Sequence, residues 1–242
     1  MKTSDYIQYR IDRFPKGYIF TYMDFITEVK KKEAIIKSLN RMAASRRISK
    51  LSKGKYYKSV INEFGNMPPD QYQVVKDLLE KDGKLIGYLT GYSVYNQLGL
   101  TTQVSNSIQI GRNEIRPALQ RGMYRILFIK QKNTITNENI PLLQILDAIK
   151  YIRKIPDTTV DASCTRLMAI IKILPLENQT LLVKLVLKYT PAARALLGAL
   201  LEDSSIAVDT DILKKTLNPI TTYKLLGVDK VLPNAANWNI RL

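Results

Sequence analysis

The strongest chemical signal in the sequence is a cluster of basic side chains between residues 30 and 58. This segment holds eleven lysines and arginines and a single acidic residue, Glu33. Lysine and arginine side chains neutralise phosphate groups and supply the electrostatic part of nucleic-acid binding. A surface that is only solvated carries charges of both signs, so this segment predicts contact with a polyanion.

The charge of the whole chain is concentrated in the same segment. The 242 residues carry a net charge of +16, and residues 30–58 account for +10 of it. An apolar content of 45% is sufficient for a sizeable core. No run approaches the ~18 apolar residues of a membrane span, and the N-terminal residues MKTSDYIQYR lack the apolar segment of a signal peptide. We therefore expect a cytoplasmic protein without a membrane partner.

The residues that most enzymes use are scarce. Histidine is absent, and Cys164 is the single cysteine. Histidine is the commonest general base near neutral pH and a frequent zinc ligand, and neither phosphate-binding glycine pattern, GxxxxGK[ST] or GxGxxG, occurs. The sequence predicts a protein that is not an enzyme, with no cofactor and no metal. We expect Cys164 to be packed inside a helix.

One carboxylate pair is the exception to this scarcity. Asp209 and Asp211 form a DxD pattern, which could hold Mg²⁺ if a third carboxylate joined them. No third carboxylate is evident, and Asp211 precedes a helical segment. We interpret the pair as a helix cap.

The basic segment lies at the end of a recognisable order of elements. Ile7, Ile11 and Phe14 predict a first helix, and Thr21 with Asp24 resembles a capping box that opens a second. A third helix is expected from Lys31 to Ser45. Alternating residues 47–51 and 55–58, joined by a turn at 52–54, predict a hairpin. This order predicts an N-terminal winged helix-turn-helix over residues 1–60.

The winged helix-turn-helix assigns separate roles to the basic residues. The third helix fits a DNA major groove and the hairpin contacts the flanking phosphates. Helix residues expected in the groove are Lys31, Lys32, Lys37, Asn40 and Arg41. Hairpin residues expected on phosphates are Arg46, Arg47, Lys50, Lys53 and Lys55. One of Tyr56 and Tyr57 should be in the core, and the alternation does not say which.

The remainder of the chain predicts an α+β protein that is mostly α. Residues 61–70 form a linker, and residues 71–242 form a C-terminal domain with mixed strands and helices over 71–132 and helices over 133–216. Four helices are expected at 141–155, 160–174, 176–189 and 190–202. Residues 217–242 form a tail, and its Trp238, the only tryptophan, suggests that the tail docks on the domain.

A second basic patch lies in the middle region. Residues 112–132 contain Arg112, Arg116, Arg121 and Arg125, with Lys130 and Lys132, against Glu114 alone. Three interpretations remain open: an extension of the DNA footprint, a surface for a partner, or a solvated edge.

Several short motifs follow one another along the chain. The N-terminal motifs are GYIFT at 17–21, SLNR at 38–41 and GKYY at 54–57. Later motifs are NQLGLTTQ at 96–103, RALLGALLE at 194–202, LNPITTY at 217–223 and the segment 232–240. Together these motifs resemble the AbiEi-type antitoxins of type IV toxin–antitoxin systems, in particular an uncharacterised branch of that group. Residues 106–125 depart from the pattern, because an arginine-rich stretch replaces the expected turn and strand.

The resemblance implies a DNA-binding repressor of its own operon, with a C-terminal domain that antagonises a nucleotidyltransferase-like toxin. It leaves two alternatives: an interaction module that neutralises such a toxin, and a stand-alone regulator without one. The expected partners are double-stranded DNA, a cognate toxin and, on a palindromic site, a second copy of the chain.

Overall fold

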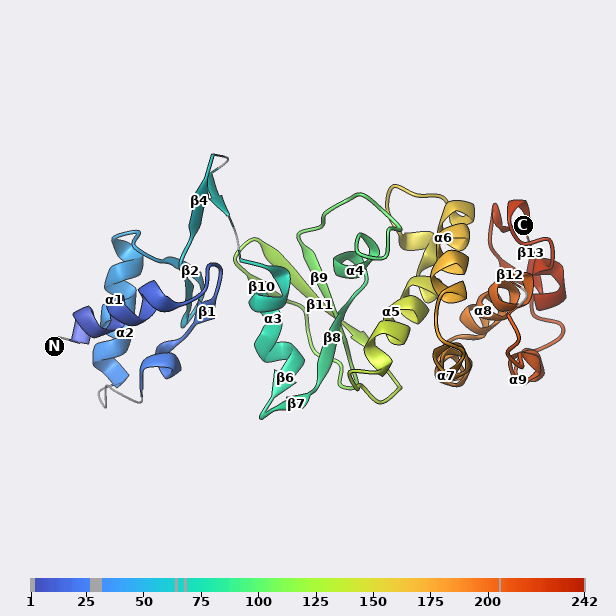
Figure 1. The fold of residues 1–242 in the computed structure, drawn as a ribbon, viewed down its shortest axis with the longest axis horizontal. Coiled ribbons are helices and arrows are strands. Elements are labelled where there is room, and N and C mark those ends of the chain that lie inside the picture. The colour runs from blue at the N-terminus through green and yellow to red at the C-terminus, as the bar shows by residue number, and fades with distance from the viewer. Residues whose placement is uncertain (1–2, 27–31, 64, 68, 205, 242) are drawn as a thin grey trace. The chain divides into compact units, whose positions relative to one another are not determined.

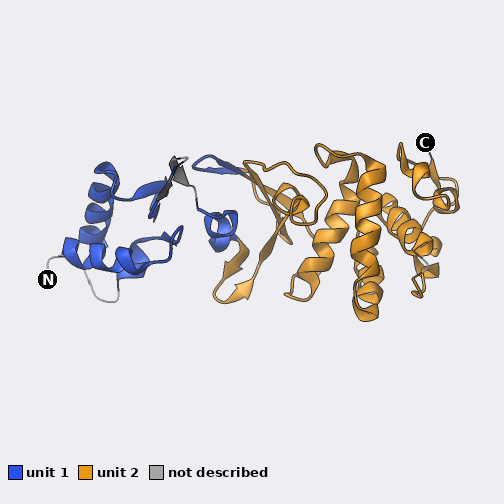
Figure 2. Ribbon diagram, turned by 45° about the horizontal axis from the view of Figure 1, so that its top comes forward, with its two compact units in different colours: residues 1–78, 119–125 blue, residues 79–118, 126–242 orange. Residues whose placement is uncertain are grey.

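The computed structural model describes residues 3–26, 32–63, 65–67, 69–204 and 206–241 (Figure 1). The chain forms two compact units (Figure 2). Unit 1 comprises residues 1–78 and 119–125, and unit 2 comprises residues 79–118 and 126–242. As the predicted helices and strands indicated, helices are combined with several small sheets.

Unit 1 begins with two helices that pack against each other and a small sheet that shares their core. Its elements are α1 (Thr3–Arg13), β1 (Ile19–Phe20), the 3-10 helix η1 (Tyr22–Phe25), α2 (Lys32–Ala44), β2 (Ser49–Ser52), β3 (Lys55–Tyr57), β4 (Val60–Asn62), β5 (Gly65–Met67), α3 (Gln71–Leu79) and β10 (Leu119–Arg121). Strands β1, β3 and β2 form one antiparallel sheet in that order, with β3 in the centre.

The core of unit 1 follows from the helical spacing of its apolar residues. Ile7 and Ile11 of α1 are buried, and so are Ile35 and Leu39 of α2. Between the helices and the sheet lies an aromatic cluster, in which the rings of Phe14, Phe20, Phe25 and Tyr56 pack at centroid distances of 5.4 to 6.4 Å. The helices and the sheet therefore share one hydrophobic core.

The predicted capping box is confirmed. The backbone N–H of Thr21 donates to the Asp24 carboxylate at 2.8 Å, and the Thr21 hydroxyl accepts from the backbone N–H of Met23 at 3.1 Å. Asp24 therefore replaces the usual glutamate. The element that it opens is the short η1, and residues 27–31 of the predicted second and third helices lie outside the described residues.

The β2–β3 hairpin turns at the predicted place. Ser52 pairs with Lys55, so Lys53 and Gly54 form the turn, and Gly54 has φ 76°. A left-handed backbone favours glycine because it has no Cβ. Tyr56 is the buried tyrosine of the hairpin, and Tyr57 is partly exposed. Side-chain alternation along β3 explains why only one of them reaches the core.

The linker that we expected over residues 61–70 is not a plain loop. Most of it belongs to the β4–β5 hairpin, in which Asn62 pairs with Gly65. Asn and Gly are favoured in tight hairpin turns as well as in loops, so composition does not separate the two. Unit 1 also extends beyond the expected boundary at residue 60, because α3 up to Leu78 and residues 119–125 belong to it.

Unit 2 has a strand-rich first part and a helical second part. Its first elements are β6 (Glu80–Lys81), β7 (Lys84–Leu85), β8 (Gly87–Thr90), α4 (Tyr92–Tyr95), β9 (Ser107–Arg112) and most of β11 (Tyr124–Lys130). Then follow α5 (Asn139–Lys150), η2 (Ile152–Lys154), α6 (Val160–Lys172), α7 (Leu176–Val186), α8 (Pro191–Asp203), α9 (Asp211–Lys215), β12 (Tyr223–Lys224), η3 (Val228–Lys230), η4 (Ala235–Trp238) and β13 (Ile240–Arg241).

Helix α8 lies at the centre of the helical part. Every residue from Ala195 to Leu201 is buried, and α5, α6, α7 and α9 all contact this helix. The C-terminal tail packs against it: Trp238 is fully buried, and a Cβ on Gly198 would lie 2.1 Å from its ring. Glycine at position 198 thus makes room for the indole. The buried Cys164 faces the same core, and burial raises the pKa of its thiol to about 12.

A buried polar network connects the strands of unit 2 to its helices. The Asp147 carboxylate of α5 accepts hydrogen bonds from the hydroxyls of Tyr88 at 2.7 Å, Thr90 at 2.7 Å and Tyr189 at 2.9 Å. Burial raises the pKa of Asp147, and the three hydroxyls oppose this effect. The network satisfies a charged group that would otherwise be costly to bury.

Candidate nucleic-acid interface

Helix α2 has one apolar face and one polar face. Ile35, Leu39 and Met42 are buried in the core of unit 1, whereas Lys37 and Arg41 are exposed. The spacing of four residues between Lys37 and Arg41 places them on the same side of a helix. The helix therefore presents cationic side chains to solvent along a rigid element.

The other three residues predicted to enter the groove differ from Lys37 and Arg41 in their contacts. Lys31 lies outside the described residues. The Lys32 ammonium lies 4.8 Å from the centroid of the Tyr22 ring, a cation–π contact that directs it toward η1. Asn40 is exposed, and its side-chain oxygen accepts a hydrogen bond from the Tyr56 hydroxyl at 2.7 Å. With that oxygen engaged by Tyr56, the amide NH₂ of Asn40 remains as a donor.

Acidic residues of α1 lie near the end of α2. Arg41 and Arg47 line a shallow hollow together with Asp5 and Asp12. Asp12 also pairs with Lys58 at 3.5 Å. Carboxylates lower the local positive potential, so this side of unit 1 is less attractive to phosphate than the charge of residues 30–58 alone suggests.

The β2–β3 hairpin carries the remaining predicted cations. Arg46, Arg47, Lys50 and Lys53 are exposed, and Arg46 has φ 58° in the loop after α2. Lys53 lies at the turn beside Gly54. No ion pair or side-chain hydrogen bond engages these four residues within the described part of the chain.

Lys55 is not a free cation. Its ammonium pairs with Asp77 of α3 at 2.6 Å, and its side chain is 19% exposed. Burial lowers the pKa of Lys55 and the charge of Arg121 adds to this effect, while Asp77 opposes both. The prediction that Lys55 contacts phosphate therefore needs correction, because folding directs its charge to a carboxylate within unit 1.

Arg121 completes this cluster. Its guanidinium donates to both Asp77 carboxylate oxygens, at 2.6 and 2.8 Å, and to the Val74 carbonyl at 2.7 Å. Burial alone would raise the pKa of Asp77, but the hydrogen bonds from Arg121 and Lys55 outweigh burial and hold it below its usual range. The cluster joins β3, α3 and β10, and it explains why unit 1 includes residues 119–125.

The expected second basic patch is not a single surface. Arg112 and Arg121 are buried, whereas Arg116 and Arg125 are exposed. Arg112 and Arg116 belong to unit 2, and Arg121 and Arg125 belong to unit 1. A count of charges along the sequence does not show which side chains are buried. Side-chain alternation along strands β9 and β10 directs Arg112 and Arg121 inward.

Of the predicted DNA contacts, six cations thus remain exposed and without an ionic or aromatic partner in the described residues. They are Lys37, Arg41, Arg46, Arg47, Lys50 and Lys53. Glu33 is the only acidic residue of α2. The arrangement can bind an extended polyanion through side chains on a helix, a loop and a hairpin.

Contacts within unit 1 that sequence reasoning missed involve residues far apart in the chain. Asp77 is 22 residues from Lys55 and 44 from Arg121, and Tyr56 is 16 from Asn40. No local pattern marks any of them. Packing of α3 and β10 against the hairpin brings Lys55, Asp77 and Arg121 together, and packing of α2 against β3 brings Asn40 to Tyr56.

The Asp209–Asp211 pair is the remaining motif that the sequence singled out. The Asp209 carboxylate accepts the backbone N–H of Asp211, the first residue of α9, in a turn just before the helix. The N-cap position is Thr210, whose side chain makes no capping hydrogen bond, so the expected side-chain cap is not seen. No group of three potential metal ligands is found within the described ranges, and no helix there is long and apolar enough to cross a membrane.

Comparison with known proteins gives one family and one similar fold. A model of a family of unknown function, DUF6088, matches residues 6–182. No curated protein matches the chain. The crystal structure of the RV2827C protein from Mycobacterium tuberculosis is similar, with a TM-score of 0.62 and 12% sequence identity over 90% of this chain and 82% of that chain. At this identity the similarity concerns the fold alone.

Proposed function

The chain belongs to the DUF6088 family, whose function is unknown, and we propose that it is a DNA-binding transcriptional regulator. The observation that carries the proposal is the set of six exposed cations on α2 and the following loop and hairpin. The resemblance to AbiEi-type antitoxins extends the proposal to an autorepressor of a type IV toxin–antitoxin operon.

Unit 1 is interpreted as a winged helix-turn-helix. Helices α1 and α2, the short η1 between them and the β1–β3–β2 sheet follow the order of that fold. In this interpretation α2 is the recognition helix and the β2–β3 hairpin is the wing. Lys37, Asn40 and Arg41 face the major groove, and Lys50 and Lys53 face the flanking phosphates.

Salt dependence tests the electrostatic part of the proposal. Each neutralised phosphate releases condensed counterions, so log K falls with log salt concentration. If the four free cations outside the recognition helix, Arg46, Arg47, Lys50 and Lys53, contact phosphate, the slope should be about −4. Binding of the full chain to a labelled duplex, followed by fluorescence anisotropy between low and high salt, measures it. A slope near zero would overturn the proposal.

Two lysines of the same hairpin form a matched pair for this experiment. Lys53→Ala removes a free cation, so it should weaken binding to all sequences alike and reduce the slope by about 1. Lys55→Ala removes a cation already paired with Asp77 at 2.6 Å, so it should leave the slope nearly unchanged. The opposite result would show that the wing contacts are misassigned.

A second candidate function is an interaction module that neutralises a toxin. The observation in its favour is an exposed apolar turn between α6 and α7, where Ile173 is 82% and Leu176 59% exposed. Such residues are common anchors of protein interfaces. Co-purification with the product of a neighbouring reading frame tests it, and Ile173→Ser should weaken that contact without changing DNA binding.

A further inference from the structure

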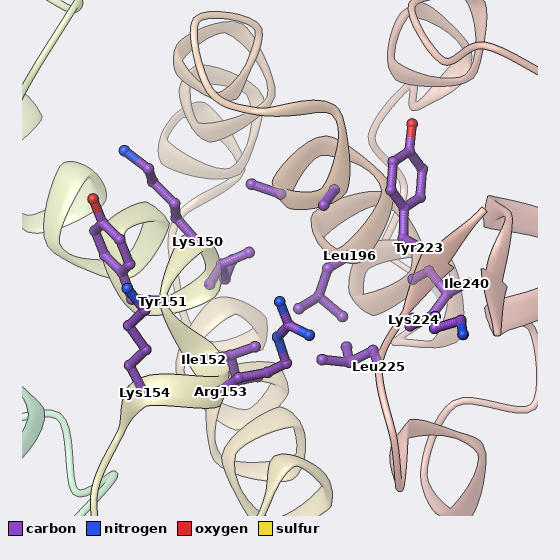
Figure 3. Close-up of a pocket in the computed structure, with 13 residues that line it drawn as sticks. Lys150, Tyr151, Ile152, Arg153, Lys154, Leu196, Tyr223, Lys224, Leu225 and Ile240 are labelled. Carbon is purple, nitrogen blue, oxygen red and sulfur yellow. The ribbon is translucent and has the colours of Figure 1, made fainter. Parts of the chain in front are cut away.

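Unit 2 contains a hollow that the proposed DNA contacts do not use. Its volume is about 430 Å³, within the range of small-molecule sites. Three segments line it: residues 149–154 at the end of α5 and in η2, the first turns of α8, and strands β12 and β13 (Figure 3). All three segments belong to unit 2, so the hollow is defined within one compact body.

The floor of the hollow is apolar and fixed. Buried core residues provide it, namely Ile149, Ile152, Ala193, Leu196, Leu225 and Ile240. These side chains belong to the same hydrophobic core as α8 and Trp238. Because a close-packed core does not rearrange freely, the hollow exists before any ligand enters it. An apolar surface of this shape favours a ligand with a compact apolar body.

The rim of the hollow is cationic. Lys150, Arg153, Lys154 and Lys224 line it, and no aspartate or glutamate does. Two of these cations already have aromatic partners. The Lys150 and Lys154 ammonium groups lie 4.8 and 5.5 Å from the Tyr151 ring centroid.

Arg153 is placed differently. Figure 3 shows its guanidinium extending over the hollow toward Leu196 and Leu225, whereas Lys150 and Lys154 point toward the Tyr151 side. In the described part of the chain no carboxylate pairs with Arg153. A guanidinium without a counter-ion above an apolar floor matches a carboxylate, because its planar fork can donate two parallel hydrogen bonds.

The geometry points to a binding site for a small amphipathic carboxylate, with its apolar body on the α8 floor and its head on Arg153. Other ligand classes fit less well. A metal ion or a cationic peptide would be repelled by the four basic side chains of the rim. A sugar would require many polar partners, and the floor consists of aliphatic side chains.

Binding of 4-phenylbutyrate to the full-length chain tests this site, with 4-phenylbutanol as the uncharged probe of similar shape. Isothermal titration calorimetry should show one saturable site for the acid and at least tenfold weaker binding of the alcohol. Inorganic phosphate, which has charge but no apolar body, should bind far more weakly than the acid.

Three variants separate charge from shape. Arg153→Gln keeps an exposed polar side chain. It should lower the affinity for the acid about tenfold and leave the affinity for the alcohol unchanged. Ala192→Phe places a ring at the exposed edge of the hollow, so it should lower the affinity for both the acid and the alcohol. Arg116→Gln is the matched control, because Arg116 is exposed in unit 2 and does not line the hollow.

Several results would overturn the inference. They are the absence of saturable binding at millimolar acid, equal affinity for acid and alcohol, and unchanged acid binding in Arg153→Gln. Circular dichroism of each variant shows whether it is folded. The result does not depend on DNA binding, because all residues tested lie in unit 2 and the proposed DNA contacts lie in unit 1.

Discussion

Asn40 and Arg41 occupy neighbouring positions on α2 but have different surroundings. Arg41 is exposed beside the acidic residues of α1, and Asn40 is hydrogen-bonded to Tyr56. Both side chains suit base recognition, because arginine pairs with guanine and asparagine with adenine in the major groove. An adenine would have to share or replace the Tyr56 hydroxyl as the partner of the Asn40 oxygen.

We expect Arg41→Ala and Asn40→Ala to relax base preference. A direct base contact contributes about 1–3 kcal/mol of discrimination, so binding to the best site and to single-base variants should become more equal. Competition binding measures this. Tyr56→Phe is the matched control for Asn40, because it removes their hydrogen bond and keeps the amide. If neither alanine variant alters preference, α2 does not read bases.

Asp77 should stabilise unit 1 in a pH-dependent manner. Its pKa is lowered in the folded state, so its contribution is present above the ordinary aspartate pKa of about 3.9 and is lost as pH falls through the folded value. Asp77→Asn should cost about 1 kcal/mol at neutral pH, a modest amount because Asp77 is half exposed and water screens the pair.

Hydrogen exchange of β3 and α3 measures this effect within unit 1. The difference between wild type and Asp77→Asn should disappear at a pH where Asp77 is protonated. Equal protection of the two proteins at pH 7 would mean that the Lys55–Asp77–Arg121 cluster contributes nothing to stability.

At the scale of elements, the Asp147 network joins α5, β8 and the end of α7. It differs from the Asp77 cluster because its carboxylate is buried among neutral hydroxyls rather than cations. The folded-state pKa of Asp147 is raised, so the folded chain binds more protons than the unfolded chain above the ordinary aspartate pKa. The contribution of Asp147 to stability should therefore decrease as pH rises.

In Asp147→Asn, the free energy of unfolding should fall less steeply as pH rises above the ordinary aspartate pKa. Asparagine keeps the shape and an acceptor oxygen but cannot ionise. Asp147→Ala should instead cost about 1–3 kcal/mol, because the buried hydroxyls of Tyr88 and Thr90 and the partly buried hydroxyl of Tyr189 lose their acceptor. Denaturant unfolding followed by the fluorescence of Trp238, which reports on unit 2, measures both. A wild-type pH profile retained in Asp147→Asn would contradict this assignment.

At the scale of the whole molecule, the two units have separate cores and separate candidate sites. The six exposed cations belong to unit 1, and the amphipathic hollow belongs to unit 2. If unit 1 binds DNA and unit 2 binds a carboxylate, as we propose, a ligand of unit 2 could act on a regulator.

Selection of bound duplexes from random DNA should recover a defined operator. If two copies bind a palindrome, half-sites should recur about one helical turn apart, roughly 10 base pairs centre to centre, or at multiples of that spacing. Sedimentation of the complex on the selected duplex should then give two chains per duplex. If no sequence is enriched, the protein binds DNA without sequence specificity, which would contradict the proposed operator.

Much of the fold was predictable because its signals are local. Helical spacing of apolar residues identified α1, α2 and the four long helices of unit 2, and alternation identified the β2–β3 hairpin. The structure differs from the sequence interpretation at residues 61–70 and 112–125, because composition alone does not distinguish a linker from the β4–β5 hairpin or an exposed arginine from a buried one. Arg121 is the clearest case, since its burial depends on Asp77, which lies 44 residues away.

The sequence by itself determined the elements, the concentration of positive charge in residues 30–58 and the scarcity of enzymatic side chains, since these depend on residue type and short spacing. Only the tertiary structure decided which cations are free, which tyrosine is buried, and that an apolar hollow with Arg153 above it exists. The physical reason is that charge pairing, burial and cavity shape are set by residues distant in the chain, which packing alone brings into contact.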